Sequence, residues 1–559
     1  MAVETSISKA QQHMGQYNRT LTRAGKIARE PALLFAVGGS VVLLALFLFL
    51  PLGKVLAMPG LADWLAYFET PRFVKATLNS LFMAVISTAS ATVLGFVFAY
   101  AVTYVEVPGS RFFRIIGLLP LMSPPFVTGL AFILLFGRRG LITWTLLGLR
   151  PDIYGWKGLW AVQTFAFFPT AYLSISSVLK AAGSSLEFAA VNLGARRWRV
   201  FRDIVLPLAT PGIAGAALLV ASEVLADFGN PMLIAGDFTV LATESYLELI
   251  TNWSPARAAV LSTVLLVPAL AVFLVQRSVV ERRSFVTVTG KPIQGGRVGP
   301  APWLKWGLAA FCLVVALFVV AIYGVILVCA FVKTWGADFT LTAYHFVMAV
   351  VHGKELVNSV MLSAMAAAFS ALFTVVLAYV VQFKQVPGKA ALDFAAVLPS
   401  AVPGTVLGIG YILAFNSGPL AMTGTALIIV TFMVFHYMAV GYRTASGMLK
   451  QIDRGIEEAS TNLGAHSLRS FWSVMLPLMK PAFTTGLLYT FIRSMNSVSG
   501  PVFLISPSWK LASVSIINLA DHGYWGQASS LGVAVVGSIF VVLGLARFVL
   551  GEKVRLFEM

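Results

Sequence analysis

The chain alternates long apolar runs with short polar stretches over almost its whole length. About 20 consecutive apolar residues are needed to cross a bilayer as a helix. The runs lack the polar–apolar alternation of membrane β-strands, so they predict an all-α polytopic membrane protein. Twelve runs are long enough to span, six in each half: 33–52, 76–105, 113–136, 158–179, 211–234, 258–275, 304–332, 356–381, 391–415, 421–442, 481–505 and 527–550.

Composition supports this class and sets the orientation. Of the 559 residues, 58% are hydrophobic and only 11% are charged, and the mean hydropathy is +0.85. The net charge of +17 does not indicate nucleic-acid binding, because Lys and Arg collect in the cytoplasmic loops of membrane proteins. Most of the 40 Lys and Arg fall on one face if the amino terminus is cytoplasmic, and we expect that topology.

The two halves of the chain are one repeat. The dipeptide Asn-Ser occurs at 79–80 and again at 358–359, a shift of 279 positions, whereas Gly194 and Gly464 differ by 270. The second half has therefore lost nine residues, and the loss falls between its third and fourth spans, where a surface loop tolerates it. Six spans per half give both halves the same orientation, so we expect parallel repeats.

Four segments follow from this organisation. We predict a cytoplasmic tail at 1–30, a first transmembrane half at 31–277, a cytoplasmic linker at 278–303 and a second transmembrane half at 304–559. The linker is rich in Arg, Gly and Pro.

One polar, basic stretch lies between spans in each half, at 186–207 and 456–477. Both contain Asn-Leu-Gly-Ala and close with Leu-Pro, and both favour a short helix, a turn and a second helix. Glycine allows the positive φ of a sharp turn. The pattern of Glu-x-Ala, a Gly five residues later and a Pro thirteen residues after the Gly resembles the EAA loop of permease subunits of binding-protein-dependent ABC importers. The departures from it are Phe188 and Ser460, where Ala is more usual.

That resemblance implies that the two stretches form coupling helices, which bind a cleft of an ATPase subunit. The basic flanks of the two copies differ, so their surfaces are not equivalent. The docking residues that it implies are Glu187, Ala189, Gly194, Arg197, Glu457, Ala459, Gly464 and Arg469.

No catalytic or metal-binding motif accompanies these loops. The sequence lacks the G-x-x-x-x-G-K-[ST] phosphate loop, and its six His are scattered without metal-ligand spacing. We therefore expect no enzyme activity, metal or cofactor in this chain, and we expect ATP and magnesium to bind a separate ATPase subunit.

Ionisable residues inside spans are costly and indicate function. Glu223 and Asp227 lie in the fifth predicted span, and the repeat places Arg493 opposite Glu223. We predict that Glu223 and Arg493 pair near the translocation pathway; the alternative is that neighbouring helices satisfy each one separately. Pro124 and Pro403 break the third span and its repeat, and these breaks either line a cavity or are packed kinks.

Three further stretches, 120–143, 223–231 and 401–416, resemble the fused two-half permeases of the ferric-iron-type importer group. The resemblance implies two ATPase subunits, an extracytoplasmic solute-binding protein and a place in the inner membrane. Ferric iron is the expected solute, with a phosphate ester or phosphonate as the alternative. An ion-coupled secondary transporter would explain the spans but not the repeated loops, and a membrane-embedded enzyme would need clustered His or acidic residues.

Overall fold

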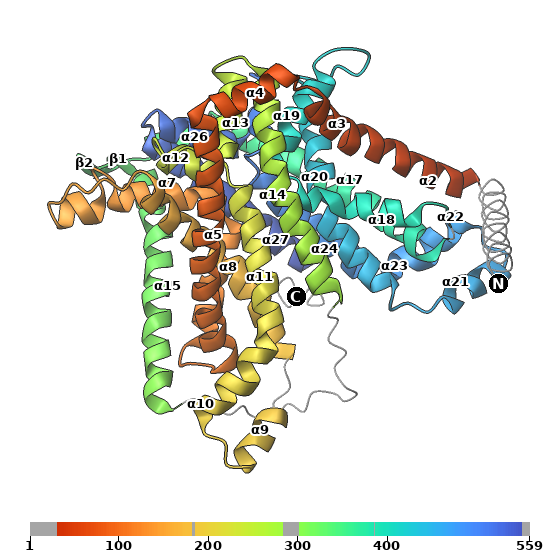
Figure 1. Cartoon of the computed structure of the whole chain (residues 1–559), viewed down its shortest axis with the longest axis horizontal. Helices are drawn as coiled ribbons and strands as arrows, with labels where there is room; N and C mark the ends of the chain where they lie inside the picture. The colour runs from red at the N-terminus through yellow and green to blue at the C-terminus, as the bar shows by residue number, and fades with distance from the viewer. Residues whose placement is uncertain (1–30, 182–184, 283–300, 385, 551–559) are drawn as a thin grey trace. The chain divides into compact units, whose positions relative to one another are not determined.

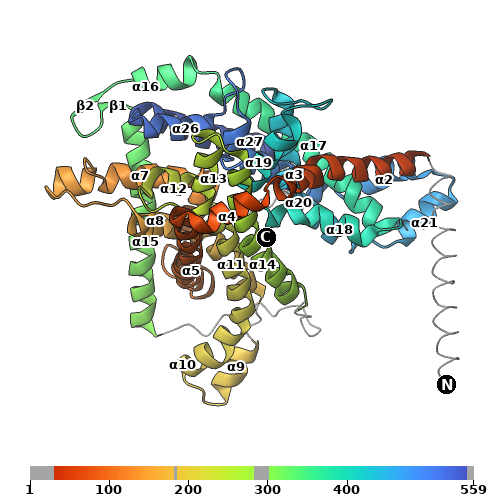
Figure 2. The same cartoon turned by 45° about the horizontal axis from the view of Figure 1, so that its top comes forward.

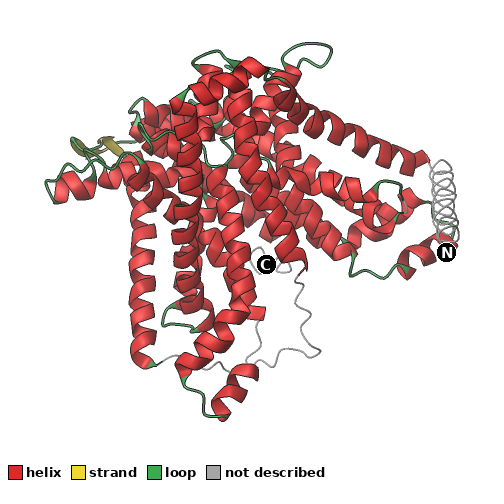
Figure 3. Cartoon of the chain, viewed as in Figure 1, coloured by secondary structure: helices red, strands yellow, loops and turns green. Residues whose placement is uncertain are grey.

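The chain folds almost entirely as α-helix, as the sequence predicts (Figure 3). A computed structural model describes residues 31–181, 185–282, 301–384 and 386–550. The predicted tail at 1–30 and most of the predicted linker lie outside these residues. In the described part, the strands are β1 (Val332–Thr334) and β2 (Asp338–Leu341), which pair as an antiparallel hairpin.

The chain divides into two compact units, and each draws on both halves of the sequence (Figure 1). Unit 1 comprises Met1–Leu52, Leu362–Ser400 and Ala426–Ser494, and unit 2 comprises Gly53–Met361, Ala401–Thr425 and Met495–Met559. The helices of unit 1 are α2 (Pro31–Leu44), most of α17 (Glu355–Phe383), α18 (Lys389–Val397), α20 (Ala426–Leu449), α21 (Gly455–Asn462), α22 (Ser467–Ser470), α23 (Leu476–Leu478) and α24 (Lys480–Met495). The first half supplies to unit 2 α3 (Leu50–Ala57), α4 (Leu61–Glu69), α5 (Pro71–Ala99), α6 (Ser110–Leu118), α7 (Pro125–Phe136), α8 (Trp156–Ala181), α9 (Ser185–Asn192), α10 (Arg197–Val200), α11 (Leu206–Leu225), α12 (Gly229–Ile234), α13 (Leu241–Ile250) and α14 (Pro255–Arg282). The second half adds α15 (Pro302–Ala330), α16 (Tyr344–Phe346), α19 (Gly404–Phe415), α25 (Pro501–Leu504), α26 (Ala512–Asp521) and α27 (Trp525–Leu550).

Helices α5, α8 and α11 pack against one another at the centre of unit 2. The contact is close because small residues lie in it: a Cβ added at Gly95 of α5 would come within 2.6 Å of the Ala171 Cβ of α8. Gly212 of α11 meets Val178 of α8 in the same way, with a Cβ–Cγ2 distance of 2.6 Å. Membrane helices associate through such small residues because lipid provides little hydrophobic drive.

Ten helices of the described residues are long and apolar enough to cross a membrane, or eleven if one bent pair counts as a span. The prediction of an all-α polytopic membrane protein is confirmed, and ten or eleven of the about twelve predicted spans are helices of that length in the described residues. Four of the twelve runs, 113–136, 211–234, 391–415 and 481–505, are not single helices.

Prolines interrupt the third run and its repeat, as predicted. Helix α7 begins at Pro125 directly after Pro124, and α19 begins directly after Pro403. Both prolines have extended backbone, with φ −56° and ψ 133° at Pro124 and φ −56° and ψ 142° at Pro403. In the second half the break separates the helical segments Lys389–Ala401 and Gly404–Phe415.

The run 481–505 is also broken, which corrects the prediction of one continuous span. Helix α24 has 16 residues and ends at Met495, and α25 begins at Pro501. The intervening residues 496–500 include two Ser and a Gly, and Pro501 follows them; all of these oppose helix continuation. The equivalent run of the first half breaks at the same place, between α11 and α12.

The repeated Asn-Ser dipeptide makes the same hydrogen bonds in both halves. The Asn79 side chain donates to the Thr239 carbonyl at 2.8 Å, and the Ser80 Oγ accepts from the Leu241 amide at 2.8 Å. In the second half, Asn358 donates to the Lys510 carbonyl at 3.2 Å and Ser359 accepts from the Ala512 amide at 2.8 Å. These bonds hold the first turn of α13 and of α26 against a long helix, so the internal repeat extends to tertiary contacts.

Candidate docking loops

The two repeated polar stretches each form two short helices around a glycine turn. We define docking loop 1 as α9 and α10 with the residues between them, and docking loop 2 as α21 and α22 with theirs. Gly194 has φ +83° and Gly464 has φ +85°, in the left-handed region that favours glycine. A Cβ added at either glycine meets no atom within 4 Å, so backbone conformation and not space requires glycine there. Figures 1 and 2 both show docking loop 1 at the end of α11.

Glu457 anchors docking loop 2 to the long helix α17. Its Oε1 accepts a hydrogen bond from the Tyr379 hydroxyl at 2.5 Å and forms an ion pair with the Lys384 Nζ at 2.5 Å. Lys384 also donates to the Ser467 Oγ, at 2.9 Å, at the start of α22. The side chains of Lys384 and Glu457 are only 15% and 13% exposed. The ammonium therefore joins both helices of the loop to α17.

Glu187 occupies the corresponding position in docking loop 1 and is 2% exposed. The repeat shift of 279 relates Tyr100 to Tyr379, so a tyrosine precedes each docking loop at the same position of the repeat. Glu187 is buried and Glu457 is bonded to α17, so neither glutamate belongs to the exposed surface of its loop.

The opposite side of each loop is apolar and exposed. Leu193 is 88% exposed and Leu463 is 89% exposed, and each directly precedes the turn glycine. Trp198 of docking loop 1 is also more than half exposed. Exposed apolar patches bounded by polar residues mark interaction sites. The other predicted docking side chains on this surface are exposed: Ala189, Arg197, Ala459 and Arg469.

The two docking surfaces differ in charge and capping. Docking loop 1 exposes Arg196, Arg197 and Arg199 after its turn. In docking loop 2, His466 instead caps α22 by accepting a hydrogen bond on Nδ1 from the Arg469 amide at 3.3 Å.

Asp227, a predicted pathway residue, lies in a hydrogen-bonded network inside unit 2. Its carboxylate accepts from Gln163 Nε2 at 3.0 Å, from the Asn230 amide at 3.2 Å and from the Asn230 Nδ2 at 3.0 Å. Gln163 in turn accepts from the Ser87 hydroxyl at 2.9 Å. The network links α5, α8 and α12 to Asp227, which lies in the break after α11, so these bonds hold that break in place.

Glu223 accepts a hydrogen bond from Thr170 Oγ1 at 2.8 Å. It belongs to unit 2 and Arg493 belongs to unit 1, so their pairing stays a prediction. The pathway roles of Pro124 and Pro403 stay predictions as well.

Several further residues position these elements and were not among the predicted site residues. Leu193 and Leu463 lie in the identical Asn-Leu-Gly-Ala tetrapeptide, and an apolar residue repeated within a polar loop was the available signal. Tyr100 and Tyr379 are also related by the repeat. No sequence signal marks Lys384, because the repeat places Val105 at its position.

Glu244 was missed too. It is fully buried on α13, and its Oε1 lies 2.7 Å from the Nε of Arg72, which is half exposed at the start of α5. Burial raises the pKa of Glu244, and Arg72 opposes this shift without cancelling it.

A helical chain with ten or eleven candidate spans in its described residues, an internal repeat and one exposed polar loop per repeat has the organisation of a two-half membrane permease. The chain belongs to the family of binding-protein-dependent transport system inner membrane components, which matches residues 91–285 and 370–554. The two matches lie one in each half and confirm the repeat. The family excludes the ion-coupled secondary transporter and the membrane-embedded enzyme considered above.

Two relatives match most of the chain. The ferric transport system permease protein FbpB of Actinobacillus pleuropneumoniae is 34% identical over 491 residues, which are 86% of this chain and 72% of that protein. The putative ferric transport system permease protein FbpB 1 of Haemophilus influenzae is 35% identical over 445 residues, 78% of this chain and 70% of that protein. A half-sized relative, the putative 2-aminoethylphosphonate transport system permease protein PhnV of Salmonella paratyphi A, is 30% identical over 265 residues, 45% of this chain and 99% of its own.

Proposed function

We propose that this chain is the membrane subunit of an ATP-driven importer that translocates ferric iron delivered by an extracytoplasmic solute-binding protein. Two ATPase subunits bind the chain, one at each docking loop. ATP and magnesium bind those subunits, so this chain carries no cofactor and catalyses no reaction. It is a multi-pass protein of the inner membrane with a cytoplasmic amino terminus, an orientation supported by the excess of Lys and Arg in the loops of that face.

The observation that carries the docking proposal is the exposed leucine beside each turn glycine. Leu193 and Leu463 are nearly fully exposed at the same position of two loops that otherwise differ in charge. A homodimeric ATPase presents the same cleft twice, so it requires a feature common to both loops. The bonds of Glu457 to Tyr379 and Lys384 support this surface from behind in docking loop 2. ATP binding closes the ATPase dimer, and the loops transmit that movement to the spans.

Ferric iron is the proposed solute because two relatives named as ferric permeases match over most of the chain. The phosphonate alternative is supported by PhnV, which matches about half of it.

The predicted pair of Glu223 and Arg493 belongs to the proposed pathway. Reversing either charge alone should reduce expression and uptake, and exchanging both should restore them. Failure of the exchange to restore either would count against the pair.

The decisive experiment measures ATP hydrolysis by this chain reconstituted with its ATPase and its binding protein. We expect the binding protein loaded with ferric ion to stimulate hydrolysis more than the same protein offered 2-aminoethylphosphonate. Stimulation by the phosphonate alone would overturn the substrate proposal and keep the importer. A chain that binds no ATPase would overturn the docking proposal.

A further inference from the structure

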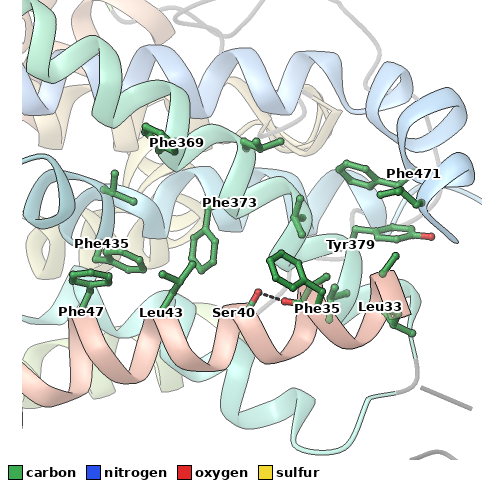
Figure 4. Close-up of a pocket in the computed structure, with 18 of the residues that line it drawn as sticks. Leu33, Phe35, Ser40, Leu43, Phe47, Phe369, Phe373, Tyr379, Phe435 and Phe471 are labelled. Atoms are coloured by element: carbon green, nitrogen blue, oxygen red, sulfur yellow. Dashed lines mark hydrogen bonds between the residues drawn. The ribbon is translucent and has the colours of Figure 1, made fainter. Parts of the chain in front are cut away.

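A long apolar groove in unit 1 separates α2 from α17, α20 and docking loop 2 (Figure 4). Its volume is about 500 Å³, within the range of roughly 300–1,000 Å³ typical of ligand sites. Phe35 and Leu43 of α2 line one side, and Phe369, Phe373 and Phe435 line the other. All of these residues belong to the same compact unit.

The groove offers almost no hydrogen-bonding groups to an occupant. The Ser40 hydroxyl donates to the Ala36 carbonyl at 2.7 Å, and the Thr431 hydroxyl donates to the Leu427 carbonyl at 2.8 Å. Each hydroxyl is therefore used within its own helix. Burying an unpaired polar group is costly, so the groove favours an apolar occupant.

The groove persists although α2 presents a small-residue face to it. Ala36, Gly39 and Ser40 would allow the close approach that small residues normally give membrane helices. Aromatic contacts prevent that approach at one end, where the rings of Phe47 and Phe435 stack with centroids 5.2 Å apart. Since α2 is held away there, the space beside the small residues stays open.

The groove has an apolar end and a more polar end. It follows α2 and the helical turn after it, from residue 47 back to residue 32, roughly 22 Å at 1.5 Å per residue. This is long enough to hold an acyl chain, which extends through the ~15 Å hydrocarbon depth of one leaflet. The more polar end, near residue 32, is lined by Tyr379, Ser467 and Trp472. Ser467 belongs to docking loop 2, and Trp472 directly follows that loop. Tyr and Trp are typical of the membrane–water interface.

We propose that the groove binds one acyl chain of a membrane lipid, with the headgroup beside docking loop 2. Helix α2 is a candidate span in an inner membrane component, so lipid is the apolar molecule that surrounds it. The long apolar interior matches the chain, and the amphipathic end matches the headgroup. The site rests on the membrane location of α2 and is independent of the transported solute.

The test uses the whole protein in nanodiscs of phosphatidylethanolamine containing a small fraction of lipid with a diazirine at the middle of one acyl chain. Photolabelled peptides are mapped by mass spectrometry. We expect labelling of α17 and α20 at Phe369, Phe373 and Phe435 to exceed that of other lipid-exposed helices by at least several-fold.

Two adjacent glycines give a matched pair of variants. Gly39 lines the groove and Gly38 does not, and a Cβ added at either meets no atom within 4 Å. Gly39→Leu should fill the groove and reduce the labelling several-fold, whereas Gly38→Leu should leave it unchanged. Ala36→Leu is a second filling variant, and thermal unfolding checks that all three fold.

Equal labelling in the Gly39→Leu and Gly38→Leu variants would overturn the proposal. The proposal would also be overturned if the groove residues were labelled no more strongly than other lipid-exposed helices, or not at all. In that case the groove is either empty or filled by another segment of the protein. None of these measurements requires an ATPase or a solute, so their failure is distinct from failure of the proposed function.

Discussion

Removing the charge of Glu457 tests whether the docking helices are held in place from behind. Glu457→Gln keeps the size of the side chain but replaces the carboxylate that Tyr379 and Lys384 contact. A hydrogen bond to a charged group contributes about 1.5–3 kcal/mol, against about 0.5–1.5 kcal/mol for a neutral one. With two such contacts, both largely shielded from water, the substitution should weaken the anchor by about 1–3 kcal/mol. That change raises the equilibrium constant for detachment of docking loop 2 from α17 roughly 5- to 150-fold.

Hydrogen exchange of residues 455–470 in the whole chain measures this directly. Glu458, the next residue on α21, is exposed, so Glu458→Gln makes the same charge change without touching the anchor. We expect faster exchange and weaker coupling of ATP hydrolysis to uptake in Glu457→Gln, and neither effect in Glu458→Gln. A double-mutant cycle with Tyr379→Phe should be non-additive by about 0.5–3 kcal/mol, as for residues in contact.

The reasoning is refuted if both glutamine variants exchange at the same rate. It is also refuted if Glu457→Gln and Tyr379→Phe have additive effects, because the hydroxyl and the carboxylate would then act independently.

Three further predictions concern the loops and a buried acid. Leu463→Ser should weaken ATPase binding by about 1.5–3 kcal/mol, the value of burying one Leu, in a pull-down in which Leu420→Ser, an exposed leucine outside both loops, binds normally. Gly464→Ala should destabilise the turn by about 1–2 kcal/mol because its φ is positive, whereas Gly447→Ala, in a helix with free space at its Cβ, should be neutral or stabilising; equal thermal shifts would contradict this. Because the pKa of Glu244 is raised in the folded protein, the folded state binds a proton more readily than the unfolded chain. Stability should therefore fall as the pH rises from 4.5, the ordinary pKa of a glutamate, through the pKa of Glu244 in the folded protein. Glu244→Gln should flatten this fall in thermal melts, and an unchanged pH profile would contradict it.

Features that depend on local sequence were predictable. The turn glycines, the proline breaks and the repeat follow from residue type and spacing, because Gly and Pro constrain the backbone wherever they occur. The break before Pro501 was missed because the run around it is apolar, and hydropathy alone does not distinguish a continuous helix from a broken one.

Features that depend on tertiary contact were not predictable. The motif predicts Glu187 and Glu457 as docking residues. Their low exposure depends instead on where α5 and α17 end, which the motif does not show. The network around Asp227 depends on Gln163 and Ser87, which are distant in sequence.

The difference between the loops limits which residues can provide the common affinity for an ATPase. The flank after the turn exposes three arginines in docking loop 1, whereas docking loop 2 has His466, Ser467 and Arg469 there, and Ser467 is bonded to Lys384. An ATPase cleft whose affinity depended on the three arginines would bind docking loop 1 only. The Asn-Leu-Gly-Ala turn is identical in both loops and its leucine is nearly fully exposed in each. We therefore expect the leucines to provide the affinity common to both loops, and the arginines to determine only how tightly docking loop 1 binds relative to docking loop 2.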